Sequence, residues 1–140
     1  MKIKEVMNPS AEMVSPNMSV YEAADKMLNE NIGFLCVGDN NQLQGTLTDR
    51  DIVIRAVAKG KDLRDTKVSE IFTDTLEYCE VDKDVDEAAQ LMSQQQIRRL
   101  PVLDQNKQLV GIVSIGDLAQ HISPQTAGDV LRGVTAEQRV

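Results

Sequence analysis

The stretch VYEAADKMLNENIGFLCVGDNN at residues 20–41 returns 65 residues later as VDEAAQLMSQQQIRRLPVLDQN at 85–106. Ten of the 22 aligned positions are identical. One residue is then inserted, and QLQGTLTDRD at 42–51 aligns with QLVGIVSIGD at 108–117. Self-similarity of this kind is the signature of an internal repeat. A repeat determines the overall architecture, so it is identified before the individual helices and strands.

The two copies of the repeat account for most of the chain. We place the first copy at 1–67, the second at 68–122 and a C-terminal tail at 123–140. A short leading segment opens each copy, since IKEVM at 3–7 aligns with VSEIF at 68–72.

Each copy predicts the element order β-α-β-β-α. Ser19 and Asp84 are each followed three residues later by Glu, which is the signature of a capped helix start. Short apolar strands then flank a turn rich in Asn and Asp, typical of a hairpin. A second helix follows, and Gly60 marks its expected end in the first copy. The sequence therefore predicts an α+β fold of two repeats packed about a pseudo-twofold axis, with two related clefts between them.

The tail predicts one further helix. Ser123 and Pro124 suit an N-cap and a first turn. Val130, Leu131 and Val134 would let this helix pack on the body of the protein or on a second subunit.

Composition limits the classes of function. The net charge of −7 opposes binding to nucleic acid. No apolar run is long enough for a membrane span, and the N-terminus lacks the apolar core of a signal peptide, so we expect a cytoplasmic protein without a membrane partner. Cys36, Cys79 and His121 are too few and too dispersed for a metal site. No nucleophile–base pair is visible, so we expect no enzyme.

The repeated Gly–hydroxyl–Asp ending of each hairpin permits two interpretations. In the structural one, Thr48 with Asp51 and Ser114 with Asp117 only cap helices. In the functional one, the hydroxyl and the helix start hold a phosphate, and the carboxylate accepts the two hydroxyls of a ribose. A catalytic pair of Asp49 and Asp51 is disfavoured, because residues two apart on a helix point in different directions.

With these segments together, the chain resembles a pair of cystathionine β-synthase (CBS) domains, also called a Bateman module. The resemblance runs from Ile3 to about Ile122 and rests on SVYEAADKM, DVDEAAQLM, IRRLPVLD, GTLTDRDI and GIVSIGDL. It implies a regulatory energy or metabolite sensor that binds an adenosine ligand such as AMP, ADP, ATP, NAD or S-adenosylmethionine. It further implies no required cofactor, a homodimer formed through helices, and a regulated partner protein. The alternative is a structural dimerising protein that binds no nucleotide.

The resemblance also implies site residues on the ribose and phosphate side. Asp51 and Asp117 would accept the ribose hydroxyls, and Thr48 and Ser114 would lie beside phosphate.

A basic residue before the second strand of the unit often reaches phosphate in this family. Arg98 or Arg99 holds that position in the second copy, although a solvated strand edge would explain both arginines equally. The corresponding Gly33 and Phe34 carry no charge. We therefore expect two competent sites with different ligand preferences.

The remaining expected contacts complete the two sites. Arg50 lies inside the first motif, where the second has Gly116, and would compensate in part for the missing charge. The adenine is expected to lie on Met7, Asn8, Glu12, Ile32 and Gly33 in one site, and on Phe72, Thr73, Glu77, Ile97 and Arg98 in the other.

Overall fold

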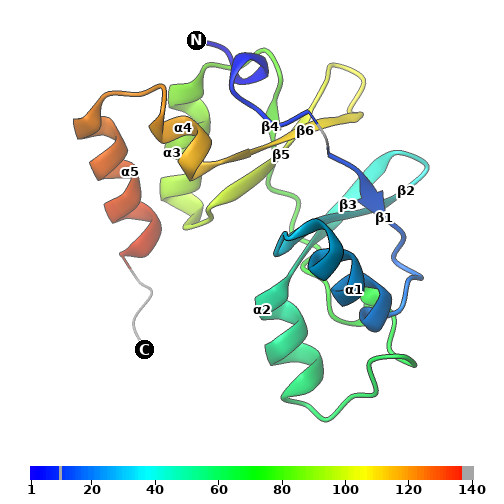
Figure 1. Ribbon diagram of the computed structural model, residues 1–140. Coiled ribbons are helices and arrows are strands. Elements are labelled where there is room, and N and C mark those ends of the chain that lie inside the picture. Colours follow the sequence, from blue (N-terminus) through cyan, green and yellow to red (C-terminus); the bar gives the residue numbers. More distant parts are fainter. Residues whose placement is uncertain (10, 137–140) are drawn as a thin grey trace. The chain divides into compact units, whose positions relative to one another are not determined.

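The computed structural model describes residues 1–9 and 11–136, so the end of the predicted tail, 137–140, lies outside the described residues. The chain divides into two compact units (Figure 1). We call Glu12–Leu76 the repeat-1 unit, and Met1–Ala11 with Glu77–Val140 the repeat-2 unit.

The repeat-1 unit contains a three-stranded sheet in the order β1-β2-β3. Strand β1 runs parallel to β2, and β2 pairs with β3 as an antiparallel hairpin. Its elements are β1 (Met13–Val14), α1 (Val20–Glu30), β2 (Phe34–Asp39), β3 (Gln42–Thr48), α2 (Asp49–Ile52), the π-helical turn η2 (Val53–Val57) and the 3₁₀ turn η3 (Val68–Glu70).

The repeat-2 unit has the same topology, in the order β4-β5-β6, with one helix added. Its elements are the 3₁₀ turn η1 (Ile3–Glu5), β4 (Cys79–Glu80), α3 (Val85–Gln95), β5 (Arg99–Leu103), β6 (Leu109–Ser114), α4 (Ile115–Ala119) and α5 (Pro124–Thr135). The predicted α+β class and the element order β-α-β-β-α are therefore confirmed in both units.

The first helices of the two units have the same length and end in the same way. Helices α1 and α3 are each 11 residues long. Asn31 and Gln96 close them in the left-handed region, at φ 54° and 56°. Residues with positive φ satisfy the last carbonyl groups of a helix and turn the chain toward the next strand.

The two helix starts differ, and this corrects one expectation. Ser19 Oγ accepts the backbone N–H of Glu22 at 3.0 Å, as predicted. Asp84 stands at the N-cap of α3, but its side chain makes no capping bond. The chain's own start takes part instead, because the N–H of Val85 donates to the carbonyl oxygen of Met1 at 3.0 Å.

Each unit takes its leading segment from the other copy of the repeat. Ile3 is fully buried in the core of the repeat-2 unit, and its N–H donates to Lys83 O at 2.9 Å. Val68 and Ile71 lie in the core of the repeat-1 unit, where the N–H of Val68 donates to Met18 O at 2.8 Å. The compact units therefore exchange the first turn of each sequence copy.

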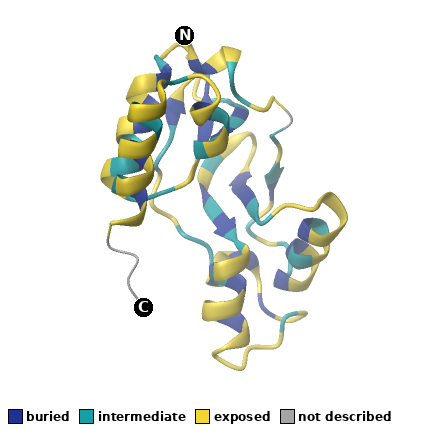
Figure 2. Ribbon diagram, turned by 60° about the vertical axis from the view of Figure 1, so that its left-hand side comes forward, coloured by how far each residue is buried: buried dark blue, intermediate teal, exposed yellow. Residues whose placement is uncertain are grey.

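Both cores are aliphatic, as the 3% aromatic content requires. Figure 2 shows that most strand residues are buried or intermediate, whereas the helices expose one side. Cys36 and Cys79 are buried free thiols, and burial raises the pKa of each to about 12. They are therefore small core residues and poor nucleophiles.

The tail forms α5, which packs against α3 (Figure 1). Ser123 caps it as expected, and Val130 and Val134 are buried. Leu131, which we grouped with them, is 54% exposed. No helix in the described part of the chain has the length and apolar character that a bilayer span needs.

Candidate functional site

The two Gly–hydroxyl–Asp motifs end a hairpin and begin a helix in both units. The N–H of Asp51 donates to Thr48 Oγ1 at 3.1 Å, and the N–H of Thr48 donates to Asp51 Oδ2 at 2.9 Å. Ser114 and Asp117 repeat these bonds at 3.0 and 2.9 Å. The predicted capping is therefore confirmed, because both pairs form reciprocal capping boxes.

The capping box uses only one oxygen of each carboxylate. In both units Oδ2 accepts the bond from the N-cap residue. A carboxylate has two acceptor oxygens, so Oδ1 retains capacity for other donors. The Asp51 side chain is only 13% exposed, which restricts its orientation further. Capping and ribose binding are therefore compatible, since the cap holds the carboxylate in place.

Arg55 is a site residue that the sequence reasoning missed. Its Nε lies 3.8 Å from Asp51 Oδ1, and its Nη1 donates to the carbonyl oxygens of Ile71 at 3.1 Å and Phe72 at 3.4 Å. The signal was its position four residues after Asp51 on a helix. The second copy has His121 at the corresponding position. Arg55 thus joins the motif carboxylate to the leading segment in the repeat-1 unit alone.

The glycine that opens each motif allows the backbone of a leading segment to pack closely against the strand. A side chain at Gly45 would collide with the carbonyl oxygen of Thr73. At Gly111 the added Cβ would lie 2.9 Å from the carbonyl oxygen of Asn8. Only glycine leaves room for this backbone, which explains its place in both motifs.

The leading segments that carry several expected adenine contacts each belong to the unit of the other copy. Met7 and Asn8 lie in the repeat-2 unit, where the N–H of Asn8 donates to Ile112 O of β6 at 2.8 Å. Phe72 and Thr73 lie in the repeat-1 unit, where Thr73 makes the corresponding backbone bonds to β3. The predicted grouping of Met7 and Asn8 with residues of the first copy, and of Phe72 and Thr73 with residues of the second, stays a prediction.

Glu12 is already engaged on the surface of the repeat-1 unit. Lys26 Nζ lies 2.7 Å from Glu12 Oε1 and 2.6 Å from Glu30 Oε2. The hydrogen bond from Lys26 lowers the pKa of Glu12, and the bonds to the two glutamates raise the pKa of Lys26. A role for Glu12 beside adenine remains a prediction.

The other predicted residues lie at corresponding places in the two units. The turn from α1 to β2 carries Ile32 and Gly33, and the turn from α3 to β5 carries Ile97 and Arg98. Phe34 and Arg99 are the first residues of the strands that follow. Arg50 and Gly116 are exposed at the starts of α2 and α4, and Glu77 is half-buried before β4.

The two units differ in charge where the hairpin begins. The N–H of Asp49 donates to Gly33 O at 3.0 Å, and the N–H of Ile115 donates to Arg98 O at 2.9 Å, so the positions correspond. The repeat-2 unit thus carries the side chain of Arg98 from this place in the backbone. A Cβ at Gly33 would lie 2.6 Å from Asp49 Oδ2, so the repeat-1 unit carries a carboxylate instead.

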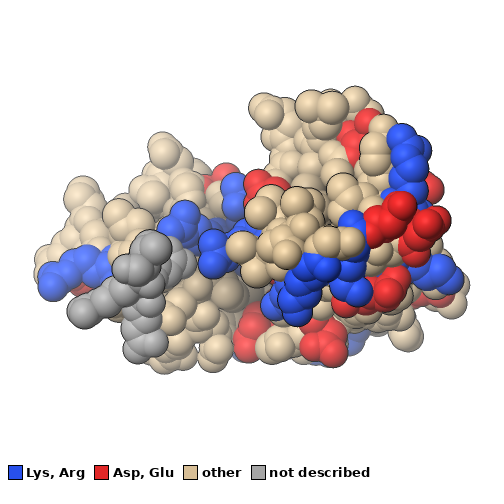
Figure 3. All heavy atoms as spheres, turned by 90° about the horizontal axis from the view of Figure 1, so that it is seen from below, with Lys and Arg blue, Asp and Glu red and all other residues tan. Residues whose placement is uncertain are grey.

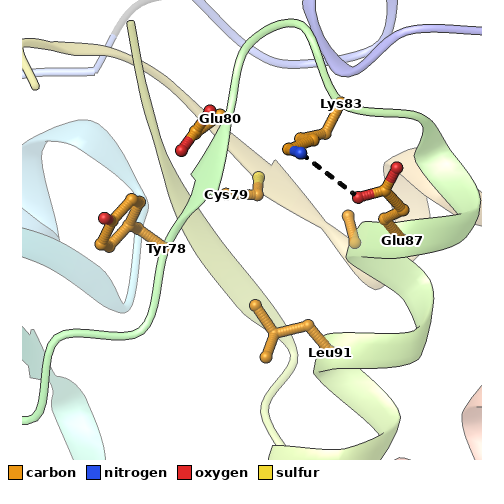
Figure 4. A pocket seen from close by; sticks show the side chains of 7 residues that line it. Tyr78, Cys79, Glu80, Lys83, Glu87 and Leu91 are labelled. Atoms are coloured by element: carbon orange, nitrogen blue, oxygen red, sulfur yellow. Dashed lines mark ion pairs between the residues drawn. The ribbon is translucent and has the colours of Figure 1, made fainter. Parts of the chain in front are cut away.

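A hollow of about 270 Å³ lies elsewhere in the repeat-2 unit, between β4 and α3 (Figure 4). Its charged pair is Lys83 and Glu87, whose Nζ and Oε2 atoms lie 3.9 Å apart. None of the predicted ligand-binding residues lines it. Its lining residues are Tyr78, Cys79, Glu80, Lys83, Glu87, Ala88 and Leu91.

Acidic and basic side chains lie interspersed on the face drawn in Figure 3. With a net charge of −7, the overall field of the protein repels anions. An anionic ligand would therefore depend on individual arginines. Over the described residues, no group of three or more His, Cys, Asp or Glu is arranged to hold a metal ion.

Known proteins share this sequence and fold. The CBS domain family matches residues 3–57 and 68–124. The chain is 42% identical over 134 residues to the CBS domain-containing protein YhcV of Bacillus subtilis (strain 168), which covers 95% of this chain and 94% of YhcV.

Two solved structures extend this similarity. The conserved CBS domain protein TA0289 of Thermoplasma acidophilum, of unknown function, has a TM-score of 0.84 at 26% identity, covering 95% of this chain and 75% of that one. The CBS domain pair of protein MJ0100, in complex with 5′-methylthioadenosine and S-adenosyl-L-methionine, has a TM-score of 0.77 at 30% identity, covering 86% and 94%.

Proposed function

The chain belongs to the CBS domain family as a tandem pair, and from this premise we propose that it is a regulatory module that binds an adenosine-containing ligand without catalysis. One observation carries the proposal. Asp51 and Asp117 are each fixed by a capping box through Oδ2, so that Oδ1 is held in the same orientation in both units. The adenosine ligands of the MJ0100 pair support this choice of ligand class.

Ribose recognition follows from these carboxylates. Both ribose hydroxyls donate to Oδ1 of the aspartate, which strengthens the bonds because the acceptor is charged. Each such bond contributes about 1.5–3 kcal/mol. The base then lies against the leading segment next to the motif glycine, which supplies the Phe72 ring in the repeat-1 unit and the Met7 thioether in the repeat-2 unit.

The exchanged segments give the ligand a route to regulation. A ligand at Asp51 that also contacts Phe72 joins the first copy of the repeat to the leading segment of the second. Ligand binding shifts a conformational equilibrium only by its difference in affinity between two states. We therefore propose that the ligand favours the state in which the leading segment is seated on β3, and that a partner protein senses this state.

The two buried thiols suit the reducing cytoplasm, where we propose that the protein acts.

We propose homodimerisation through the helices of the repeat-1 unit. Leu28 of α1 is 77% exposed, and Val53, Ile54 and Val57 are exposed on the second helix of the same unit. In the repeat-2 unit α5 covers α3, where Ser93 takes the place of Leu28. Among the described residues of the repeat-1 unit, no helix corresponding to α5 covers these apolar side chains. A second copy of the chain would cover them.

Two pairs of substitutions separate ligand binding from capping. Asp51→Asn with Asp117→Asn leaves one oxygen for the cap but replaces the other acceptor with an amide donor. Asp51→Ala with Asp117→Ala also removes the acceptor for the N–H of Thr48 and Ser114, and each lost hydrogen bond costs about 0.5–1.5 kcal/mol of stability. By calorimetry, both double variants should lose adenosine binding, and only the alanine pair should lose much stability. If the asparagine pair binds adenosine as tightly as wild type, the motif is only a cap and the structural alternative holds.

A further inference from the structure

We infer that the two sites accept different charges: the repeat-1 site binds adenosine ligands whose 5′ substituent is uncharged or cationic, and the repeat-2 site binds 5′-phosphorylated ones. This inference rests on the proposed function and assigns a ligand class to each site. Its basis is that the Asp49 carboxylate of the repeat-1 unit lies where a side chain at Gly33 would begin, whereas the repeat-2 unit has Arg98 in place of Gly33 and Ile115 in place of Asp49.

Asp49 is held beside the motif hydroxyl by its own bonds. Its N–H donates to Gly33 O at 3.0 Å, and its Oδ1 accepts the N–H of Arg50 at 2.8 Å. Oδ2 then lies where a side chain at position 33 would begin. Because Thr48 directly precedes Asp49, any group bound at the Thr48 hydroxyl lies close to this carboxylate.

The repeat-2 unit reverses the charge at the same place. Ile115 takes the position of Asp49 and makes the same backbone bond, to Arg98 O at 2.9 Å. Arg98 and the neighbouring Arg99 are both exposed at the start of the hairpin. A 5′-phosphate beside Ser114 would therefore lie next to the cross-strand partner Arg99 and to Asp117, but would meet Ile115 in place of the Asp49 carboxylate.

The charged residues near each motif also favour phosphate binding in the repeat-2 unit. In the repeat-1 unit Asp49 and Asp51 balance Arg50 and Arg55, and Arg55 already contacts Asp51 and two carbonyl oxygens. In the repeat-2 unit the corresponding set is Arg98, Arg99 and the single Asp117. A phosphate monoester carries a charge of about −1.5 to −2 at neutral pH, so it gains attraction only in the repeat-2 site.

AMP and adenosine are the probes, because they differ only in the phosphate. Asp117→Ala leaves the repeat-1 site as the binding site, and Asp51→Ala leaves the repeat-2 site. Calorimetry should show AMP binding at least about tenfold tighter than adenosine in the Asp51→Ala protein, because charge-assisted bonds of this kind are worth about that factor. In the Asp117→Ala protein AMP should bind no tighter than adenosine.

Asp49→Asn in the Asp117→Ala background tests the named residue. It should tighten AMP about three- to tenfold and leave adenosine unchanged, since it removes one negative charge without changing shape. Asp39→Asn makes the same charge change at the last residue of β2. It is the control and should alter the affinity for neither AMP nor adenosine. An equal preference for AMP in both single-site proteins, or no effect of Asp49→Asn, would overturn the inference. Failure of wild type to bind either probe would instead refute the proposed function itself.

Discussion

Arg55 shows how one side chain can make two similar sites unequal. It lies between the motif carboxylate of Asp51 and the carbonyl oxygens of Ile71 and Phe72, and so connects the predicted ribose and adenine contacts. His121 at the corresponding position is exposed, one turn after Asp117. We therefore assign Arg55 a positioning role in the repeat-1 site.

Arg55→Ala should weaken adenosine binding at the repeat-1 site about three- to tenfold, because the leading segment loses the side chain that holds its carbonyl groups. Calorimetry in the Asp117→Ala background measures the effect. His121→Ala in the Asp51→Ala background is the matched control and should leave affinity unchanged. Equal effects of the two substitutions would refute the positioning role.

The two buried thiols predict a dependence of stability on pH. Burial raises the pKa of Cys36 and Cys79 to about 12, above their ordinary value of 9.0. Because the folded state holds these protons more tightly, the stabilising contribution is complete below pH 9 and is lost as pH rises toward 12. Urea unfolding at pH 8 and 10.5 should show a larger loss of free energy for wild type than for the Cys36→Ala, Cys79→Ala variant. Parallel losses would show that other groups dominate.

At the scale of elements, α5 depends on close contact with α3. A side chain at Gly133 would collide with Ser93, whereas nothing lies within 4 Å of a Cβ added at Gly128. The two glycines are five residues apart on one helix, yet only one of them faces α3.

Gly133→Ala should therefore destabilise the protein by about 1–3 kcal/mol through overpacking. Gly128→Ala should stabilise it by about 0.5–1 kcal/mol, because alanine favours the helix and meets no neighbour. Chemical denaturation measures both. A stabilising effect of Gly133→Ala would contradict the close packing of α5 on α3.

Local pattern was sufficient to predict the helices, hairpins and caps, because each depends on residues near in sequence. Ser19 and Gly60 marked helix boundaries, and the motif aspartates were found from spacing alone. Asp84 marks the helix start as predicted but makes no side-chain capping bond, and the N–H of the next residue, Val85, bonds to Met1, far away in the numbering. Pattern likewise shows that the segments of Met7 and Phe72 are short turns, but not which sheet edge each of them joins.

At the scale of the whole molecule, exposed apolar residues on the repeat-1 unit predict a dimer. Leu28→Glu should give a monomer by light scattering at micromolar concentration, since it introduces a charge at the centre of the proposed contact. Leu131→Glu, on the exposed side of α5, is the control and should leave the dimer intact. A dimer that survives Leu28→Glu would place the interface elsewhere.

Ribose recognition by Asp51 and Asp117 is the central claim about the whole molecule, and a comparison of adenosine with 2′,3′-dideoxyadenosine on the wild-type protein tests it most directly. The two compounds share the base and differ only in the hydroxyls that the carboxylates are proposed to accept. Calorimetry should show adenosine binding at least about tenfold tighter, as expected for loss of charge-assisted hydrogen bonds. Equal affinity of the two compounds would contradict ribose recognition, and no binding of either would contradict the nucleoside site altogether.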